Sequence, residues 1–247
     1  MFSDTRLLRL NGSDHTNLLV CFPHAGAGIS AFRNWPTRFK NHVGVALVQL
    51  PGREDRIHED FSSSIVELSK AIADELAASN VNRLFLFGHS MGASIAWAVA
   101  EQLWFIHRCR PVLIVSAQSP TPDKQLAEQT EYDLPGWFEL LGEKFPAALK
   151  HPELRALFEK TWTSDSQWMK RELACFHPSV LPVDVHAMYG IRDGLIARTE
   201  VAQWRNFTSR HFGLVPMQGG HLYWLDQAEP IYTTIEQLIE RYSNVTS

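Results

Sequence analysis

The chain has 247 residues, of which 45% are hydrophobic and 20% are charged. This composition excludes a disordered protein and allows a substantial core in one large or two small domains. The 23 lysines and arginines against 27 aspartates and glutamates give a formal net charge of −4, which is too balanced to indicate nucleic acid or an anionic membrane as the main partner.

Short apolar runs that lack strict alternation indicate strands covered on both faces of a sheet. Helical patterns lie between them, and strands that alternate with helices predict an α/β fold with a mostly parallel sheet and helices on both faces. The predicted strands are Leu18–Phe22, Val43–Leu50, Leu84–Phe87, Val112–Ser116, Val183–Tyr189 and Phe212–Pro216. The predicted helices are Ala31–Lys40, Ser64–Ser79 (where Ser64 and Glu67 have capping-box spacing), Met91–His107, Glu200–Ser209 and Pro230–Arg241.

One stretch, Gln118–Leu181, interrupts this alternation because it contains no good strand. It is rich in aromatic residues and has helix-like pieces at Trp137–Leu141 and Leu154–Trp162. A loop of this length without structure would be unusual. We therefore expect a core of residues 1–117 and 182–247, with residues 118–181 as a helical insertion at the carboxyl edge of the sheet. Such an insertion can serve as a lid over a site; the alternative is a helical subdomain that only stabilises the fold.

The segment GHSMG, residues 88–92, fits the pattern G-x-S-x-G. Residue frequencies alone produce this pattern in about one chain in ten of this length, so its context decides its meaning. It follows a predicted strand and opens a predicted helix, which is the setting of a nucleophile elbow. Side chains at Gly88 and Gly92 would collide with backbone on so sharp a turn. Ser90 is therefore the predicted nucleophile. The alternative is a glycine-lined turn whose serine has no catalytic role.

A serine hydroxyl needs a base, and the chain has 11 histidines. In this architecture the order along the chain is serine, acid, histidine, each on a loop after a strand. His221 fits, because it follows the last predicted strand behind Gly219 and Gly220. The other histidines considered are His211 before that strand, His89 within the elbow, and His151 and His177 in the insertion.

The acid should follow the strand Val183–Tyr189, and Asp193 lies in that place. It would accept the Nδ1 proton of His221 and so fix the imidazole tautomer. Asp184 begins the strand and belongs to the opposite edge of the sheet. Asp226 is the second candidate for the acid. The alternative interpretation of Asp193 is an ordinary turn residue, since Gly194 follows it.

An oxyanion hole needs two backbone N–H groups aimed at the developing negative charge. One is expected from Met91, the residue after the serine, and the other from the loop after the strand Leu18–Phe22. That loop has the sequence FPHAGAG, residues 22–28, and its small residues allow close approach to a substrate. Ala25 is the predicted second donor. His24 has no acidic or cysteine neighbour that would indicate a metal, so we interpret it as shaping the loop.

Taken together, these motifs resemble the type II thioesterases that accompany nonribosomal peptide and polyketide synthases, within the α/β-hydrolase superfamily. The resemblance runs essentially end to end. It rests on FPHAGAG (22–28), QLPGRE (49–54), GHSMG (88–92), the GxxD turn (190–193) and GGH (219–221), of which the first two are the most specific. Four positions depart from the common pattern: Ala27 replaces a glycine, Leu222 and Tyr223 replace two phenylalanines, and Ile196 replaces a valine.

The resemblance implies hydrolysis of acyl groups from the phosphopantetheine thiol of carrier proteins, for editing or release. It implies a triad of Ser90, Asp193 and His221, oxyanion donors at Ala25 and Met91, a helical lid at 118–181, and acyl or peptidyl carrier domains of a synthase as partners. A monomer without membrane or nucleic-acid partners is expected. Two other interpretations stay open: a carboxylesterase of free small esters, and a catalytically silent fold that only binds.

The segment Gln49–Glu54 is open to two interpretations. Its Pro51-Gly52 turn precedes a mixed-charge patch of Arg53, Glu54, Asp55 and Arg56 at the same sheet edge. It shapes the pantetheine entrance, or it is a loop tied by its own ion pairs.

Cys21, Cys109 and Cys175 are odd in number and widely spaced, so they do not indicate a disulfide framework, and no C-x-x-C indicates zinc. The first ten residues lack the apolar region of a signal peptide. The motifs of nucleotide sites are also missing from the sequence. We therefore expect a reduced, cytoplasmic protein without metal or cofactor.

Overall fold

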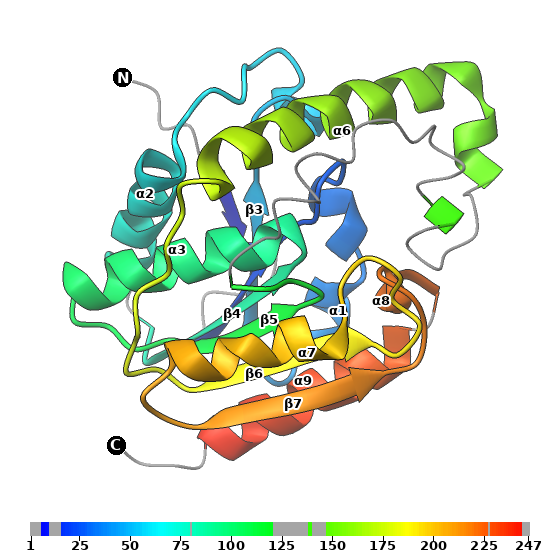
Figure 1. Cartoon of the computed structure of the whole chain (residues 1–247). Helices are drawn as coiled ribbons and strands as arrows, with labels where there is room; N and C mark the ends of the chain where they lie inside the picture. The colour runs from blue at the N-terminus through cyan, green and yellow to red at the C-terminus, as the bar shows by residue number, and fades with distance from the viewer. Residues whose placement is uncertain are drawn as a thin grey trace.

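The computed structural model describes residues 6–9, 16–79, 81–120, 138–139, 147–226 and 228–243 (Figure 1). Its sheet has the strand order β1-β3-β2-β4-β5-β6-β7. All neighbouring strands are parallel except β1, which runs antiparallel to β3. This confirms the predicted α/β fold with a mostly parallel sheet. The strands are β1 (Arg6–Arg9), β2 (Asn17–Phe22), β3 (Gly44–Gln49), β4 (Arg83–His89), β5 (Val112–Ser116), β6 (Val185–Gly190) and β7 (Phe212–Met217).

Strand β1 was not predicted from the sequence. It is four residues long and reads RLLR, which is too short to show either strand or helix periodicity. It pairs with β3 at one end of the sheet, with Arg6 opposite Gln49. Its position therefore depends on its partner strand rather than on a local signal.

Helices cover both faces of the sheet, as Figure 1 shows. On one face, α2, α3 and α7 pack with the strands in a single large apolar cluster, and on the other face α1, α8 and α9 form a second cluster with many aromatic rings. The elements of the first face are α2 (Ile65–Ala77), α3 (Met91–Phe105), α7 (Arg198–Val201) and η4 (Ala202–Phe207). Those of the second are η1 (Ile29–Phe32), α1 (Trp35–Phe39), α8 (Tyr223–Asp226) and α9 (Ala228–Ser243).

Two predicted helices are broken in the structure. The predicted helix Ala31–Lys40 is divided into η1 and α1, because Pro36 lacks the N–H that a continuous helix would need and instead occupies the first turn of α1. The predicted helix Glu200–Ser209 is a single turn of α7 followed by the 3₁₀ segment η4. The predicted capping box of α2 is confirmed: the Ser64 side chain accepts from Glu67 N, and the Glu67 carboxylate accepts from Ser64 N.

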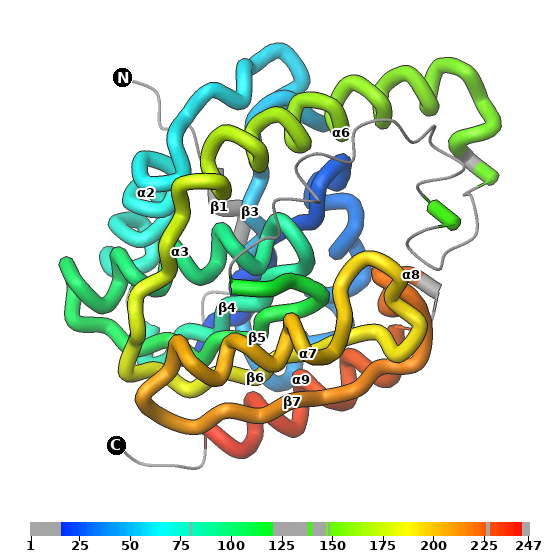
Figure 2. Tube along the Cα trace, in the orientation of Figure 1, coloured from blue at the N-terminus to red at the C-terminus, as the bar shows by residue number. Residues whose placement is uncertain are grey.

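Within the predicted insertion, the main described element is α6 (Pro152–Leu173), preceded by η3 (Ala147–Lys150). It continues well beyond the predicted helical piece Leu154–Trp162. Trp168 on α6 stacks on Phe61 with ring centroids 4.8 Å apart, and its Nε1 donates to Ser63 O at 2.8 Å. Of the predicted piece at 137–141, Phe138 and Glu139 are helical and the rest lies outside the described residues. Figure 2 traces α6 beside the segment that follows β2, although the two are far apart in sequence.

The parallel strands place the loops after β2, β4, β6 and β7 at one carboxyl edge of the sheet, where ligands bind in open α/β sheets. Strand β7 ends the strand order and carries Pro216, a residue that sheets tolerate at an edge. Across the described ranges, none of the helices combines the length and apolarity needed to span a lipid bilayer.

Candidate active site

Ser90 lies on the turn between β4 and α3 with φ 52° and ψ −122°, a backbone conformation that residues other than glycine seldom adopt. The turn is possible because two neighbours lack side chains. A Cβ on Gly88 would lie 2.2 Å from the Gly92 carbonyl oxygen, and one on Gly92 would lie 2.3 Å from the Phe22 carbonyl oxygen. The predicted steric role of both glycines is therefore confirmed, and the second contact brings the start of α3 against the end of β2.

Asp193 and His221 meet at the same edge. Asp193 Oδ2 accepts a hydrogen bond from His221 Nδ1 at 2.8 Å, and both side chains are almost completely buried. The other carboxylate oxygen of Asp193 accepts from Leu195 N at 2.9 Å and Ile196 N at 3.1 Å. The carboxylate is thus fixed from both sides, and the imidazole is left with Nε2 as its basic nitrogen.

Glycines also allow the loop that carries Asp193 to approach the loop that carries His221. A Cβ on Gly190 would lie 2.1 Å from the Gly220 carbonyl oxygen. Gly219 has φ +128°, and its carbonyl accepts from Arg192 N at 2.9 Å. The predicted sharp bend before His221 therefore exists and is joined directly to the turn that holds Asp193.

A buried hydrogen-bonded chain joins the serine turn to the histidine loop. His89 Nδ1 bonds to Ser116 Oγ at 2.7 Å, and Ser116 Oγ bonds to Tyr223 OH at 2.5 Å. Ser116 O also accepts from Ser90 N at 2.8 Å. Ser116 and Tyr223 were not predicted as site residues, although the departure from the family pattern at Tyr223 was a signal.

Burial, and then the like charge of nearby His221, lowers the pKa of His89 well below its usual value, so the His89 ring is neutral. The rings of His89 and His221 lie edge to face with centroids 5.3 Å apart. Among the described residues, no hydrogen bond joins the Ser90 hydroxyl to His221. The structure thus brings Asp193 and His221 into contact and places Ser90 on the neighbouring turn at the same edge.

The two predicted oxyanion donors are Met91, next to Ser90 on this turn, and Ala25, in the loop after β2. Met91 is the first residue of α3, where the N–H groups have no partner within the helix and carry the positive end of its dipole. Ala25 is buried in the loop after β2. His24 packs edge to face on His89 and Trp224, and burial, followed by the charges of His221 and Arg53, lowers its pKa to about 3. His24 is therefore a neutral packing residue, and within the described ranges no cluster of ligating side chains indicates a metal.

The segment Gln49–Glu54 braces the loop 22–28 and does not form a surface patch. The prediction of a mixed-charge patch was wrong for the arginines, because Arg53 is 3% and Arg56 is 5% exposed. Arg53 donates to Ala27 O at 3.0 Å and forms its ion pair with Asp165 of α6, outside its own loop. Glu54 accepts from Ile29 N and Ser30 N, both at 3.0 Å. Arg56 pairs with Glu59, which is a local ion pair of the kind that was expected.

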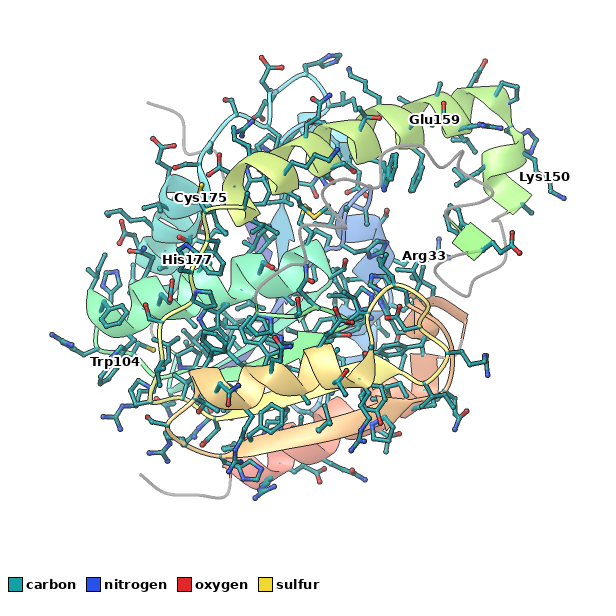
Figure 3. The ribbon with its side chains drawn as sticks, viewed as in Figure 1. Arg33, Trp104, Lys150, Glu159, Cys175 and His177 are labelled. Carbon is teal, nitrogen blue, oxygen red and sulfur yellow. The ribbon has the colours of Figure 1, made fainter. Side chains whose placement is uncertain are left out.

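The remaining candidates lie away from this arrangement. Asp184 accepts from Arg210 Nε and His211 N at the opposite edge of the sheet, as predicted. His151 precedes α6 and His177 follows it, and Figure 3 labels His177 near the end of that helix. Asp226 ends α8.

Comparison with known proteins gives concordant results. A family model described as "Thioesterase domain" matches residues 17–239. The thioesterase PikA5 of Streptomyces venezuelae is 34% identical over 226 residues, which are 88% of this chain and 79% of PikA5. The AMB antimetabolite synthetase AmbE of Pseudomonas aeruginosa is 28% identical over 239 residues, and this chain spans only 11% of its length.

Solved structures show the same likeness. RedJ, a thioesterase from the prodiginine pathway of Streptomyces coelicolor, superposes with a TM-score of 0.78 at 28% identity, covering 93% of this chain and 87% of RedJ. BorB, the type II thioesterase of the borrelidin cluster, gives a TM-score of 0.79 at 25% identity, covering 96% and 98%. A lipase-esterase related protein from Clostridium acetobutylicum, at 16% identity and a TM-score of 0.70, shares the fold.

Proposed function

Because the chain belongs to the thioesterase family, with type II thioesterases of nonribosomal peptide and polyketide pathways as its neighbours, we propose that it hydrolyses acyl thioesters carried on the phosphopantetheine arm of carrier proteins. Ser90 is the nucleophile, His221 the base and Asp193 the group that orients it. The observation that supports this most directly is the buried Asp193–His221 hydrogen bond beside a serine held at positive φ.

The proposed reaction has two halves. Ser90 Oγ attacks the thioester carbonyl while its proton passes to His221 Nε2, and the N–H groups of Ala25 and Met91 bind the oxyanion. The C–S bond then breaks, the pantetheine thiol leaves with the proton from His221, and an ester forms on Ser90. Water, giving its proton to His221, attacks this ester; the acid departs and the proton returns to Ser90.

The absence of charge on two histidines near the His221 imidazole supports this role for His221. Its neighbours His24 and His89 are both held neutral by burial. They therefore add no fixed positive charge that would oppose protonation of His221 during the reaction. Asp193, fixed by two further N–H groups, provides the negative charge that stabilises the imidazolium.

The proposal extends to partners and to the insertion. Acyl or peptidyl carrier domains are the proposed partners, since the relatives include synthetases such as AmbE and the neighbours include type II thioesterases. We assign the insertion 118–181, whose main described element is α6, as the lid over the site. The chain acts as a cytoplasmic monomer without metal or cofactor.

The first test replaces Ser90 with alanine and measures hydrolysis of an acyl-loaded carrier protein by mass spectrometry. Ser90→Ala should abolish turnover with an unchanged far-UV circular dichroism spectrum, because no other group in the site can form the acyl intermediate. Asp193→Asn should impair turnover far more than Asp226→Asn. Retained turnover in Ser90→Ala would reject the mechanism, and the reverse order of the two aspartate variants would move the acid.

A second comparison separates the alternative functions. The kcat/KM for an acylated carrier protein should exceed that for a soluble ester of the same acyl group. Equal or higher values for the free ester would favour a carboxylesterase. A serine-reactive phosphonate that failed to label Ser90 would favour a fold that only binds.

A further inference from the structure

The helix α6 contacts the loop 22–28, which carries Ala25, through one buried carboxylate. Asp165 is 0% exposed and accepts from Arg53 Nη1 at 2.7 Å and Arg53 Nη2 at 2.5 Å. It also accepts from Gly26 N at 2.7 Å. A single side chain of the insertion therefore binds both the segment after β3 and the residue that directly follows Ala25.

The same face of α6 packs on that residue. Phe158, Trp162 and Asp165 are spaced by four and three positions and so share one side of the helix. A Cβ on Gly26 would lie 2.9 Å from the Phe158 ring and 3.4 Å from Trp162 Cβ. Gly26 also has φ +78°, a conformation that favours glycine. The backbone of the loop thus lies directly against α6, with a hydrogen bond and ring contacts at the same point.

Arg53 completes this arrangement from the other side. Besides the fork to Asp165, its Nη1 donates to Ala27 O at 3.0 Å and its Nε donates to Pro51 O at 3.1 Å. The N–H of Gly26 and the carbonyl of Ala27 are consequently held by two charged groups that are paired with each other. The peptide unit that joins Ala25 to Gly26 has little freedom to rotate while this pair is intact. The preceding unit, which carries the Ala25 N–H, belongs to the same turn because His24 O accepts from Ala27 N at 3.1 Å.

We propose that Arg53 and Asp165 are positioning residues that orient the Ala25 amide for the oxyanion, so that the oxyanion hole is complete only while α6 is seated on the loop. This inference rests on the proposed function, because it assigns Ala25 as a donor. It makes α6 part of the machinery that stabilises the reaction and not only a cover over the site. The pair is suited to this coupling since removal of either member leaves a buried charge without its partner.

The primary variant is Asp165→Asn, which preserves the shape of the side chain but removes its charge and replaces one accepting oxygen with an NH2 donor. Oδ2 accepts from Gly26 N and Arg53 Nη1, and Oδ1 accepts from Arg53 Nη2, so the amide nitrogen faces a donor in either orientation. We expect kcat on an acyl-carrier substrate to fall about 10- to 100-fold with KM changed less than about threefold, since losing an oxyanion donor costs about 100- to 1000-fold and here the donor is only displaced. Hydrogen–deuterium exchange of a peptide covering residues 22–28 should become faster.

The matched control is Glu159→Gln on the same helix. Glu159, labelled on α6 in Figure 3, pairs with Arg155 at 2.8 Å, but both side chains are more than 40% exposed. This variant also removes one carboxylate charge from α6 and breaks an ion pair. It should leave kcat and the exchange of residues 22–28 unchanged. A fall in kcat equal to that of Asp165→Asn would overturn the proposal.

A double variant separates positioning from mere stability. Replacing a buried ion pair with apolar residues often preserves or raises stability, so Arg53→Met combined with Asp165→Leu should fold at least as stably as either single variant. Neither new side chain can accept from Gly26 N. We therefore expect kcat to stay low although the melting temperature recovers, and Arg53→Lys to be less impaired than Arg53→Met. Recovery of kcat together with stability would show a purely structural role and overturn the inference.

Failure of this inference is distinguishable from failure of the proposed function. Ser90→Ala tests the serine mechanism alone, and the exchange of residues 22–28 reports on the loop in any background. If Ser90 proves essential while the double variant regains full kcat, only the positioning role is rejected. If Ser90 proves dispensable, the serine mechanism is rejected, even if hydrogen–deuterium exchange of residues 22–28 becomes faster in Asp165→Asn as expected.

Discussion

At the scale of single residues, Tyr223 distinguishes this chain from the pattern of the family it resembles. Its hydroxyl bonds to Ser116 Oγ, which also bonds to His89 Nδ1. Burial raises the pKa of Tyr223 far above its ordinary value, so the phenol stays protonated. The Ser116 hydroxyl is thus the middle of a hydrogen-bonded chain that joins the loop of His221 to the turn of Ser90.

This geometry predicts an order among two variants. Tyr223→Phe removes one neutral hydrogen bond and should lower the free energy of unfolding by about 1 kcal/mol. Ser116→Ala leaves two buried polar groups without their partner and should cost about 2–3 kcal/mol. Urea denaturation measures both, with kcat followed in parallel. A larger loss for Tyr223→Phe than for Ser116→Ala would contradict the bridging role of the serine.

The sequence could predict Ser90, Asp193 and His221 because each follows a strand, and the order of strands fixes the edge where they lie. The predicted hydrogen bond between Asp193 and His221 is present, and the catalytic roles of the three residues stay predictions. The pairing of Arg53 with Asp165 could not be predicted in this way, since 112 residues separate them and only the placement of α6 brings them together. Burial of Arg53 was missed for the same reason, whereas Arg56 is held by local contacts with Gln49 O and Glu59.

At the scale of elements, the capping box predicted at the start of α2 has a measurable energy. Ser64→Ala removes the acceptor for Glu67 N and should lower the free energy of unfolding by about 1 kcal/mol. The control is Ser62→Ala, an exposed neighbour before the helix. Urea denaturation should show a loss only for Ser64→Ala, and equal losses for both variants would show that the cap contributes nothing.

The close approach of β6 to the loop after β7 depends on Gly190, which has no side chain. Gly190→Ala would place a Cβ 2.1 Å from Gly220 O, so the loop that carries His221 must move away. We expect kcat to fall at least about 100-fold, as for a displaced catalytic group. Gly213→Ala, at the other end of β7, would place its Cβ nearest to the His186 and His211 rings, at 3.0 Å and 3.7 Å, and should retain activity. The downfield proton signal of His221 Nδ1 would be lost in the first variant alone.

Long buried strands and helices with clear periodicity were predicted well, and short ones were not. Strand β1 has four residues and gains its place by pairing with β3, so no local pattern reveals it. The division of residues 29–40 into η1 and α1 follows from Pro36 and could have been predicted from that residue. The length of α6 depends on packing that only the fold supplies.

At the scale of the whole molecule, buried neutral histidines should make the protein sensitive to acid. Burial lowers the pKa of His186 to about 4, assisted by His211 and Arg241 and opposed by Asp184, and His24 and His89 are lowered as well. An unfolded histidine takes up its proton near pH 6.5, whereas these folded ones do not. Their contribution to stability is therefore complete above pH 6.5 and is lost as the pH falls toward 4.

From pH 7 to pH 5, each such histidine should cost about 2 kcal/mol in the free energy of unfolding. His186→Gln keeps a polar group near Tyr242 but cannot titrate, so its loss between these two pH values should be smaller by about that amount. Urea denaturation of both proteins at pH 7 and pH 5 measures the difference. Parallel pH profiles would show that His186 is protonated in the folded state.

Pro216 on the outermost strand β7 has a consequence for how molecules of this protein meet in concentrated solution. An unpaired strand edge is a template on which a second polypeptide can add as a further strand. Pro216 offers no N–H there and interrupts the ladder that such an addition would need. Growth of intermolecular sheets from this side is thus discouraged by one imino acid, at no cost to the pairing of β7 with β6.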